Sequence, residues 1–121
     1  MTINHTLNYL LARRHETLIC FSAAVTTGSQ YLNGPGGQPG DGLPLPKAAL
    51  VTRIDCWDGA NLKSATGLIS VAAGGRLSVY AAASGGLFDV KLRVNGVDTT
   101  LAAVGAGVNT TLFVAVHLTL L

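Results

Sequence analysis

Apolar and polar residues alternate along most of the chain, and the clearest alternation begins at residue 87. The apolar positions there are Phe88, Val90, Leu92 and Val94, and the charged positions between them are Asp89, Lys91 and Arg93. A period of two puts successive side chains on opposite faces, which predicts a half-buried strand. Asn95-Gly96 follows, and both residues tolerate the positive φ that a two-residue hairpin turn requires. The pattern therefore predicts a hairpin whose return strand covers Val97–Val104.

The same period predicts further strands at residues 17–25, 48–57, 67–73, 76–83 and 110–120. In 48–57 one face is expected to hold Leu50, Thr52, Ile54 and Cys56, and the other Val51, Arg53, Asp55 and Trp57. In 110–120 one face holds Leu112, Val114, Val116, Leu118 and Leu120, and the other Phe113, Ala115, His117 and Thr119. Glycines predict turns or breaks at 58–60, 74–75 and 105–107. Seven or eight short strands without a sustained helical period predict an all-β, antiparallel β-sandwich.

Two segments differ from this pattern and set the expected domain organisation. Residues 1–16 are expected to form an N-terminal arm, and residues 17–121 the sandwich domain. One apolar turn of helix in the arm, Tyr9 to Leu11, is too short to be stable alone, so we expect the arm to be ordered only against a partner. Its Arg13-Arg14 pair fits either a solvated surface or contact with acidic groups of a neighbouring subunit.

The second segment, residues 33–46, is rich in Gly and Pro and predicts a long loop, neither helix nor central strand.

The composition is apolar and poor in charge. Of the 121 residues, 49% are hydrophobic and 12% are charged, with a formal net charge of +2. This excludes a disordered chain and disfavours nucleic-acid binding, because the net charge is too small to hold phosphates. So little charge leaves apolar surface exposed, which favours cover by copies of the chain or by other subunits. The sequence has neither a membrane-span pattern nor a signal-peptide pattern, so we expect a protein that is made in a cytoplasm, stays soluble and does not contact a membrane.

No residue pattern indicates catalysis, a cofactor or a metal. The chain lacks a phosphate loop and a GxSxG motif, and His5, His15 and His117 have no zinc-ligand spacing. Asp55, Asp58 and Asn61 make a weak calcium pattern that fits a capped turn better. Cys20 and Cys56 are expected to be buried free thiols, although a disulfide between the sheets stays open.

The outward charged residues allow two interpretations. They are Arg53, Asp55, Asp89, Lys91 and Arg93. They fit ordinary solvent-facing pairs between strands or charges that set the register of a subunit interface. His117 is likewise expected to be a half-buried histidine with its polar groups bonded, or one of three copies that meet near a threefold axis.

The chain resembles the small jelly-roll virion proteins of tailed bacteriophages, a group that includes capsid decoration (cement) proteins and tail-fibre or baseplate head domains. The resemblance covers residues 17–120 and is carried by the order of the strands and by Phe88-Asp89-Val90 followed by Val94-Asn95-Gly96. It implies a sandwich of jelly-roll type, a homotrimer and no catalytic site. The chain departs from fibre heads because sixteen residues, rather than a fibrous stalk, precede its first strand. The loop at 33–46 is also long for a jelly roll.

From this resemblance we expect a cement protein on the virion capsid surface, with the major capsid protein and its own copies as partners. The residues expected to contact partners are Tyr9, Leu10, Leu11, Arg13, Arg14 and His117. The alternative is a tail-fibre or baseplate head that binds a host-surface glycan, for which Tyr31, Gln38 and Trp57 are the candidate contacts. A third possibility is a bacterial self-assembling shell or collagen-associated trimer domain.

Overall fold

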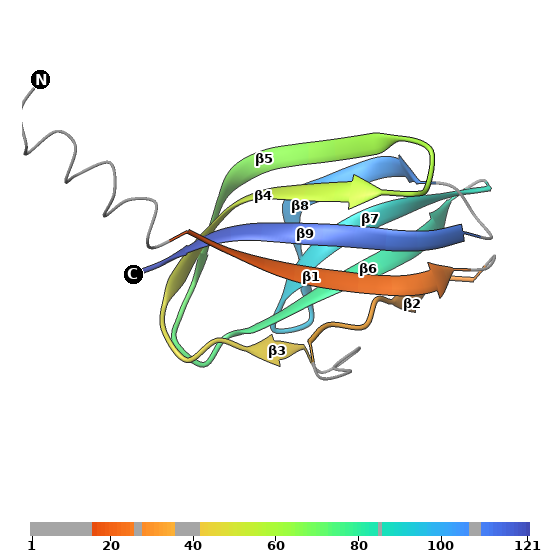
Figure 1. Ribbon diagram of the computed structural model, residues 1–121. Helices are drawn as coiled ribbons and strands as arrows, with labels where there is room; N and C mark the ends of the chain where they lie inside the picture. Colours follow the sequence, from red (N-terminus) through yellow and green to blue (C-terminus); the bar gives the residue numbers. More distant parts are fainter. Residues whose placement is uncertain (1–15, 26–27, 36–41, 85, 107–109) are drawn as a thin grey trace, which may run out of the picture.

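The computed structural model describes residues 16–25, 28–35, 42–84, 86–106 and 110–121 (Figure 1). Every regular element of this part of the chain is a strand, and all pairing is antiparallel. The strands of the first sheet, sheet A, are in spatial order β1 (Glu16–Val25), β9 (Thr110–Leu120), β4 (Ala49–Trp57) and β5 (Leu62–Val71). Those of the second, sheet B, are β2 (Gln30–Tyr31), β6 (Arg76–Ser84), β7 (Leu87–Val94) and β8 (Val97–Ala106), and β3 (Leu43–Pro44) also pairs with β6.

The predicted all-β class with antiparallel sheets is confirmed. The described residues form nine strands rather than the expected seven or eight, but β2 and β3 have only two residues each. The strand order keeps β4 beside β5, and β6, β7 and β8 side by side. These neighbouring strands are consecutive in the sequence. The strand order by itself therefore does not display the two Greek keys of a jelly roll. The jelly-roll connectivity stays a prediction.

The two sheets enclose one hydrophobic core. The alternation predicted for 110–120 is observed in β9, whose inward residues Leu112, Val114, Val116 and Leu118 are buried. They face buried residues of sheet B such as Leu77, Val79 and Leu92. Phe21 of β1 and Phe88 of β7 are the largest fully buried side chains. The apolar stripes of both sheets are thus removed from water together, which is the main favourable term in folding.

The predicted alternation of 48–57 is wrong before Arg53 because β4 contains a bulge: Ala49 and Val51 point inward, and Leu50, predicted to point inward, lies outside the core. The register shifts between Val51 and Arg53, so Thr52 interrupts the alternation. Val51, predicted to share a face with Arg53, is therefore buried in the core. After the bulge the prediction holds: Ile54 and Cys56 point inward, and Asp55 and Trp57 point outward.

The turns follow the glycines, and one strand boundary differs from its prediction by more than two residues. Asn95 and Gly96 have φ values of 53° and 79°, as the hairpin prediction requires. The predicted strand at 67–73 begins five residues earlier, at Leu62, because pairing with Trp57 and Cys56 of β4 extends it through a polar stretch. In the 33–46 loop, residues 36–41 lie outside the described residues, and Pro44 occupies the short strand β3.

Contacts between the sheets close both sides of the molecule. On one side, Ser22 of β1 forms a bridge with Asn33, through two backbone hydrogen bonds of 2.9 Å. Gly34 follows, and a Cβ added to it would lie 2.7 Å from the ring of Phe21. On the other side, a Cβ on Gly67 of β5 would lie 3.0 Å from Leu101 of β8. Both glycines therefore permit close approach of the two layers.

We expect Gly34→Ala to lower the free energy of unfolding by about 1–3 kcal/mol, because the new methyl group overpacks the buried Phe21 ring. Gly28→Ala is the matched control, since no atom of the described residues, its chain neighbours aside, lies within 4 Å of the added Cβ, and its effect should stay within about 0.5 kcal/mol. Urea unfolding of the two variants measures the difference. Equal midpoints would contradict the packing of Gly34 on Phe21.

Candidate functional site on the outer face of sheet A

The register of sheet A places outward side chains in rows across the strands, and three successive rows make up the candidate site. The first row contains Leu62, Trp57, Phe113 and Ser22. The second row contains Ser64, Asp55, Ala115 and Cys20, and the third contains Thr66, Arg53, His117 and Leu18. Residues up to about a hundred positions apart in the sequence thus become neighbours on one face, with Asp55 in the second row and Arg53 and His117 in the third.

Asp55 is the centre of the polar cluster on this face. Its Oδ1 accepts hydrogen bonds from the Ser64 hydroxyl and from Arg53 Nε, the latter at 2.7 Å. Its Oδ2 lies 2.6 Å from His117 Nε2. Arg53 Nη2 also donates to Ser64 Oγ at 3.3 Å. The cluster therefore links β4 to both of its neighbours in the sheet, β5 and β9.

These bonds stabilise the ionised form of Asp55. Desolvation by burial acts to raise the pKa of this carboxyl, but the hydrogen bonds from Ser64, Arg53 and His117 outweigh it and hold the pKa below its ordinary value. The arrangement does not match a catalytic triad, because the Ser64 hydroxyl donates to the carboxylate rather than to the imidazole. A serine nucleophile needs the imidazole as its base. The cluster therefore holds β4 against β5 and β9 and fixes the positions of the Arg53 and Asp55 charges.

Large apolar side chains lie exposed beside the polar cluster. Trp57 is 42% exposed, Leu62 59% and Phe113 53%. Together with Cys20 and Ala115 they line a shallow hollow with a volume of about 190 Å³. Small-molecule sites usually have volumes of roughly 300–1,000 Å³. The size and the apolar lining fit contact with a side chain of a protein surface better than a bound metabolite.

The two cysteines differ in their surroundings, which corrects the expectation that both are buried. Cys56 points into the core, and burial, with a smaller contribution from the charge of Asp58, raises the pKa of its thiol to about 11. Cys20 is exposed on the outer face of sheet A, opposite Ala115. Both thiols are free in the structure. Period-two alternation explains the difference, because Cys20 lies next to the buried Phe21 and must point the other way.

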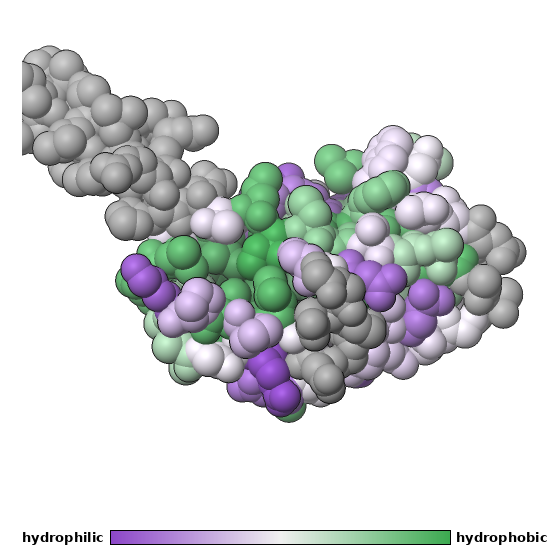
Figure 2. Space-filling model, turned by 60° about the horizontal axis from the view of Figure 1, so that its bottom comes forward, coloured by the Kyte–Doolittle hydropathy of each residue, from purple (hydrophilic) through white to green (hydrophobic). Residues whose placement is uncertain are grey.

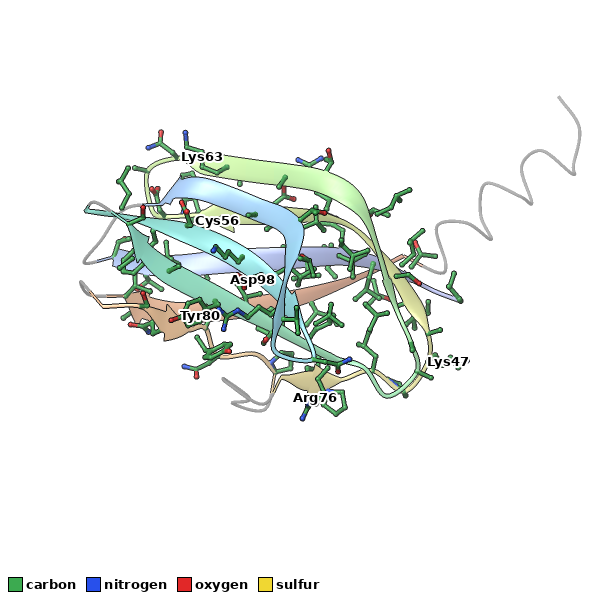
Figure 3. All side chains as sticks on the ribbon, turned by 180° about the vertical axis from the view of Figure 1, so that it is seen from behind. Lys47, Cys56, Lys63, Arg76, Tyr80 and Asp98 are labelled. Carbon is green, nitrogen blue, oxygen red and sulfur yellow. The ribbon has the colours of Figure 1, made fainter. Side chains whose placement is uncertain are left out.

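The outer face of sheet B holds the second polar cluster. Arg93 Nε donates to Asp98 Oδ1 at 2.6 Å, and Arg93 Nη1 donates to the Tyr31 hydroxyl at 2.6 Å. The guanidinium carbon lies 3.9 Å from the centre of the Tyr80 ring, a cation–π contact. The hydrogen bond with Asp98 is the main reason why the pKa of Arg93 is raised and that of Asp98 is lowered. Figure 3 shows Tyr80 and Asp98 on this face.

The structure describes only some of the residues that were predicted to contact partners. Tyr9, Leu10, Leu11, Arg13 and Arg14 lie outside the described residues, as do His5, His15 and Gln38. His117 is half-buried and bonded to Asp55, as one of its two interpretations predicted. Tyr31 and Trp57 belong to different sheets, so the structure does not bring these two glycan candidates together.

The weak calcium pattern proves to be a capped turn. Asp58 Oδ1 accepts hydrogen bonds from the backbone N–H groups of Ala60 and Asn61, at 3.0 and 2.7 Å. Gly59 adopts a φ of 91° in this turn. Asp55 belongs instead to the cluster with His117. Within the described ranges, no group of three or more His, Cys, Asp or Glu side chains could hold a metal ion.

No protein-family model, curated protein or solved structure matches this chain. In the part of the chain that the structure describes, no helix is long and apolar enough to cross a bilayer.

Sequence reasoning missed Ser64, Leu62 and Cys20 as members of this face. Alternation alone placed Trp57, Phe113 and His117 on outward faces of their strands, but it did not show which strands are neighbours. Leu62 and Ser64 were assigned to no strand because their segment is short of apolar residues. The spacing of Leu62, Ser64 and Thr66, two residues apart, is the signal that was available.

We expect Asp55→Asn to lower the free energy of unfolding at pH 7 by about 1–3 kcal/mol, because the hydrogen bonds to an ionised carboxylate are lost. The folded-state pKa of Asp55 is lowered, so its contribution is present above the unfolded pKa of about 3.9 and is lost as pH falls through the folded value. The difference between variant and wild type should therefore shrink below about pH 4. Urea unfolding at several pH values measures it.

Asp89→Asn is the control for this experiment. Asp89 lies on the outer face of sheet B, and no ion pair links it to another described residue. Its replacement should have little effect at pH 7. A pH-independent loss of stability in Asp55→Asn would contradict the electrostatic role of the cluster.

Proposed function

We propose that this chain is a non-enzymatic virion structural protein, a capsid decoration (cement) protein that binds the outer surface of a tailed-phage capsid as a homotrimer and stabilises it. A jelly-roll connectivity of its two sheets is part of this proposal. Its mechanism is mass action: a protein that binds the assembled shell and not its free subunits shifts the equilibrium toward the shell.

The observation that supports the proposal best is the contrast between bonded polar groups and exposed apolar ones. On sheet A, Arg53 and His117 bond to Asp55, and on sheet B, Lys91 and Arg93 bond to Asp98. Large apolar side chains such as Trp57, Leu62 and Phe113 remain exposed. Such a surface suits burial against other protein subunits. It offers no convergent set of reactive groups in the described residues.

A tail-fibre or baseplate head that binds a glycan is the competing function. It requires aromatic and amide groups that converge on one platform, whereas Tyr31 and Trp57 lie on separate sheets. Tyr31 also bonds to Arg93 through its hydroxyl. The cement function therefore ranks first, and the arm residues Tyr9 to Arg14 are its proposed contacts with the capsid protein.

We expect the purified chain to sediment with undecorated shells of the major capsid protein encoded nearest to it, and to raise the temperature at which those shells disassemble. Removal of residues 1–15, which leaves β1 whole, should abolish binding, because the arm supplies the proposed contacts. Sedimentation with shells and shell melting measure both effects, and far-UV circular dichroism confirms that the shortened chain folds.

Two results would count against the proposal. If the full chain stays in the supernatant and the shells melt at an unchanged temperature, the chain is not a cement protein of that capsid. If the shortened chain binds at full occupancy, the arm is not the anchor. Binding to a glycan array by a chain that ignores shells would favour the head function.

A further inference from the structure

We propose that the outer face of sheet A is the surface through which copies of this chain associate. The inference deepens the proposed homotrimer, on which it rests, by assigning the surface that joins its subunits. The occupant of the face is a second copy of the chain rather than a small molecule or the capsid protein.

The exposed apolar side chains concentrate on this face. Among the residues that the structure describes, eight large hydrophobic ones are exposed, and the five that point outward from sheet A are Leu18, Trp57, Leu62, Leu68 and Phe113. The other three, Leu87, Val97 and Leu121, lie apart from one another, at two strand starts and after the last strand. Figure 2, a view in which the side bearing β3 comes forward, shows hydrophobic residues over a broad part of the surface. A concentration of this kind marks an association surface.

The face is large enough for a stable contact between copies. Sheet A has four strands, of nine to eleven residues each. With strands ~4.8 Å apart and a rise of ~3.3 Å per residue, the face covers roughly 600 Å². In a trimer each copy turns this face toward the threefold axis and shares it between two neighbours, so the three faces bury up to roughly 1,800 Å² in total.

The charges of the face favour a copy over a charged partner. Arg53 and Asp55 cancel each other in a 2.7 Å ion pair, and His117 and Ser64 bond to the same carboxylate. A surface with an excess of one sign would repel its own copy, whereas this one carries a balanced pair. The hollow of about 190 Å³ beside Trp57 is below the usual size of a small-molecule site.

The test uses the full chain without shells and measures its mass by light scattering over a range of concentrations. The wild type is expected to have the mass of three chains and to dissociate on dilution. Leu62→Lys and Phe113→Lys should each weaken association by about tenfold or more, because a buried lysine without a partner disrupts an apolar interface. Leu87→Lys is the matched control: it makes the same change at a strand start on sheet B, where the leucine is 47% exposed.

Trp57 supplies a second measurement that needs no variant. It is the single tryptophan of the chain, and it lies in the middle of the apolar row. Its emission should move to shorter wavelength as concentration rises, since association removes the indole from water.

Labelling of the exposed Cys20 by a maleimide should slow over the same range of concentrations. The background for this experiment is Cys56→Ser, in which Cys20 is the only thiol.

Each of three results would overturn the inference. The first is a wild type that has the mass of a single chain and a Trp57 spectrum that does not change with concentration. The second is a loss of association in Leu87→Lys as large as that in Leu62→Lys. The third is a Leu62→Lys variant that still associates but no longer binds shells. The last assigns the face to the capsid protein. A chain that associates through sheet A and ignores shells keeps this inference and removes the cement function, so the two failures are distinguishable.

Discussion

The pairing of β9 between β1 and β4 is the constraint on which the rest of the structure depends. It fixes which side chains of sheet A face the core, and by the same register it fixes the rows on the outer face. Because side chains alternate, a slip of one residue would expose Val114 and Val116 and bury His117. The hydrophobic core holds the register, and the Asp55–His117 contact at 2.6 Å exists because the register is held. The hydrophobic core and the polar cluster thus both follow from the register of β9 with β1 and β4.

Several charged side chains of the described residues join neighbouring strands. Arg53 and Asp55 on sheet A, and Arg93 and Asp98 on sheet B, form close ion pairs. An exposed ion pair by itself contributes little to stability, but Asp55 also bonds to Ser64 of β5 and His117 of β9, and the Arg93–Asp98 pair joins β7 to β8. Because opposite charges lie together on each face, neither face carries an excess of one sign. What then distinguishes the two faces is apolar area. Sheet A exposes Trp57, Leu62 and Phe113, while the tyrosines of sheet B bond to or stack on an arginine.

Local patterns in the sequence predicted much of the fold. The hairpin at Asn95-Gly96 and the last strand were predicted within two residues, because each depends on turn chemistry or on strict alternation. The bulge at Thr52, the early start of β5 and the joining of Ser64 to Asp55 were not predicted. They depend on pairing between strands, and Asp55 and His117 are 62 positions apart. The contact residues proposed in the arm, Tyr9 to Arg14, lie outside the described residues.

The bulge also determines the shape of the sheet. Between two successive registers, β9 advances one residue, from Leu118 to His117, β4 advances two, from Val51 to Arg53, and β5 advances three, from Ile69 to Thr66. The same interval of the sheet therefore takes more residues in each successive strand, and β5, with the most, follows the longest path. The sheet must curve there. Gly67, in the middle of that longest interval, is the residue that meets Leu101 of the opposite sheet.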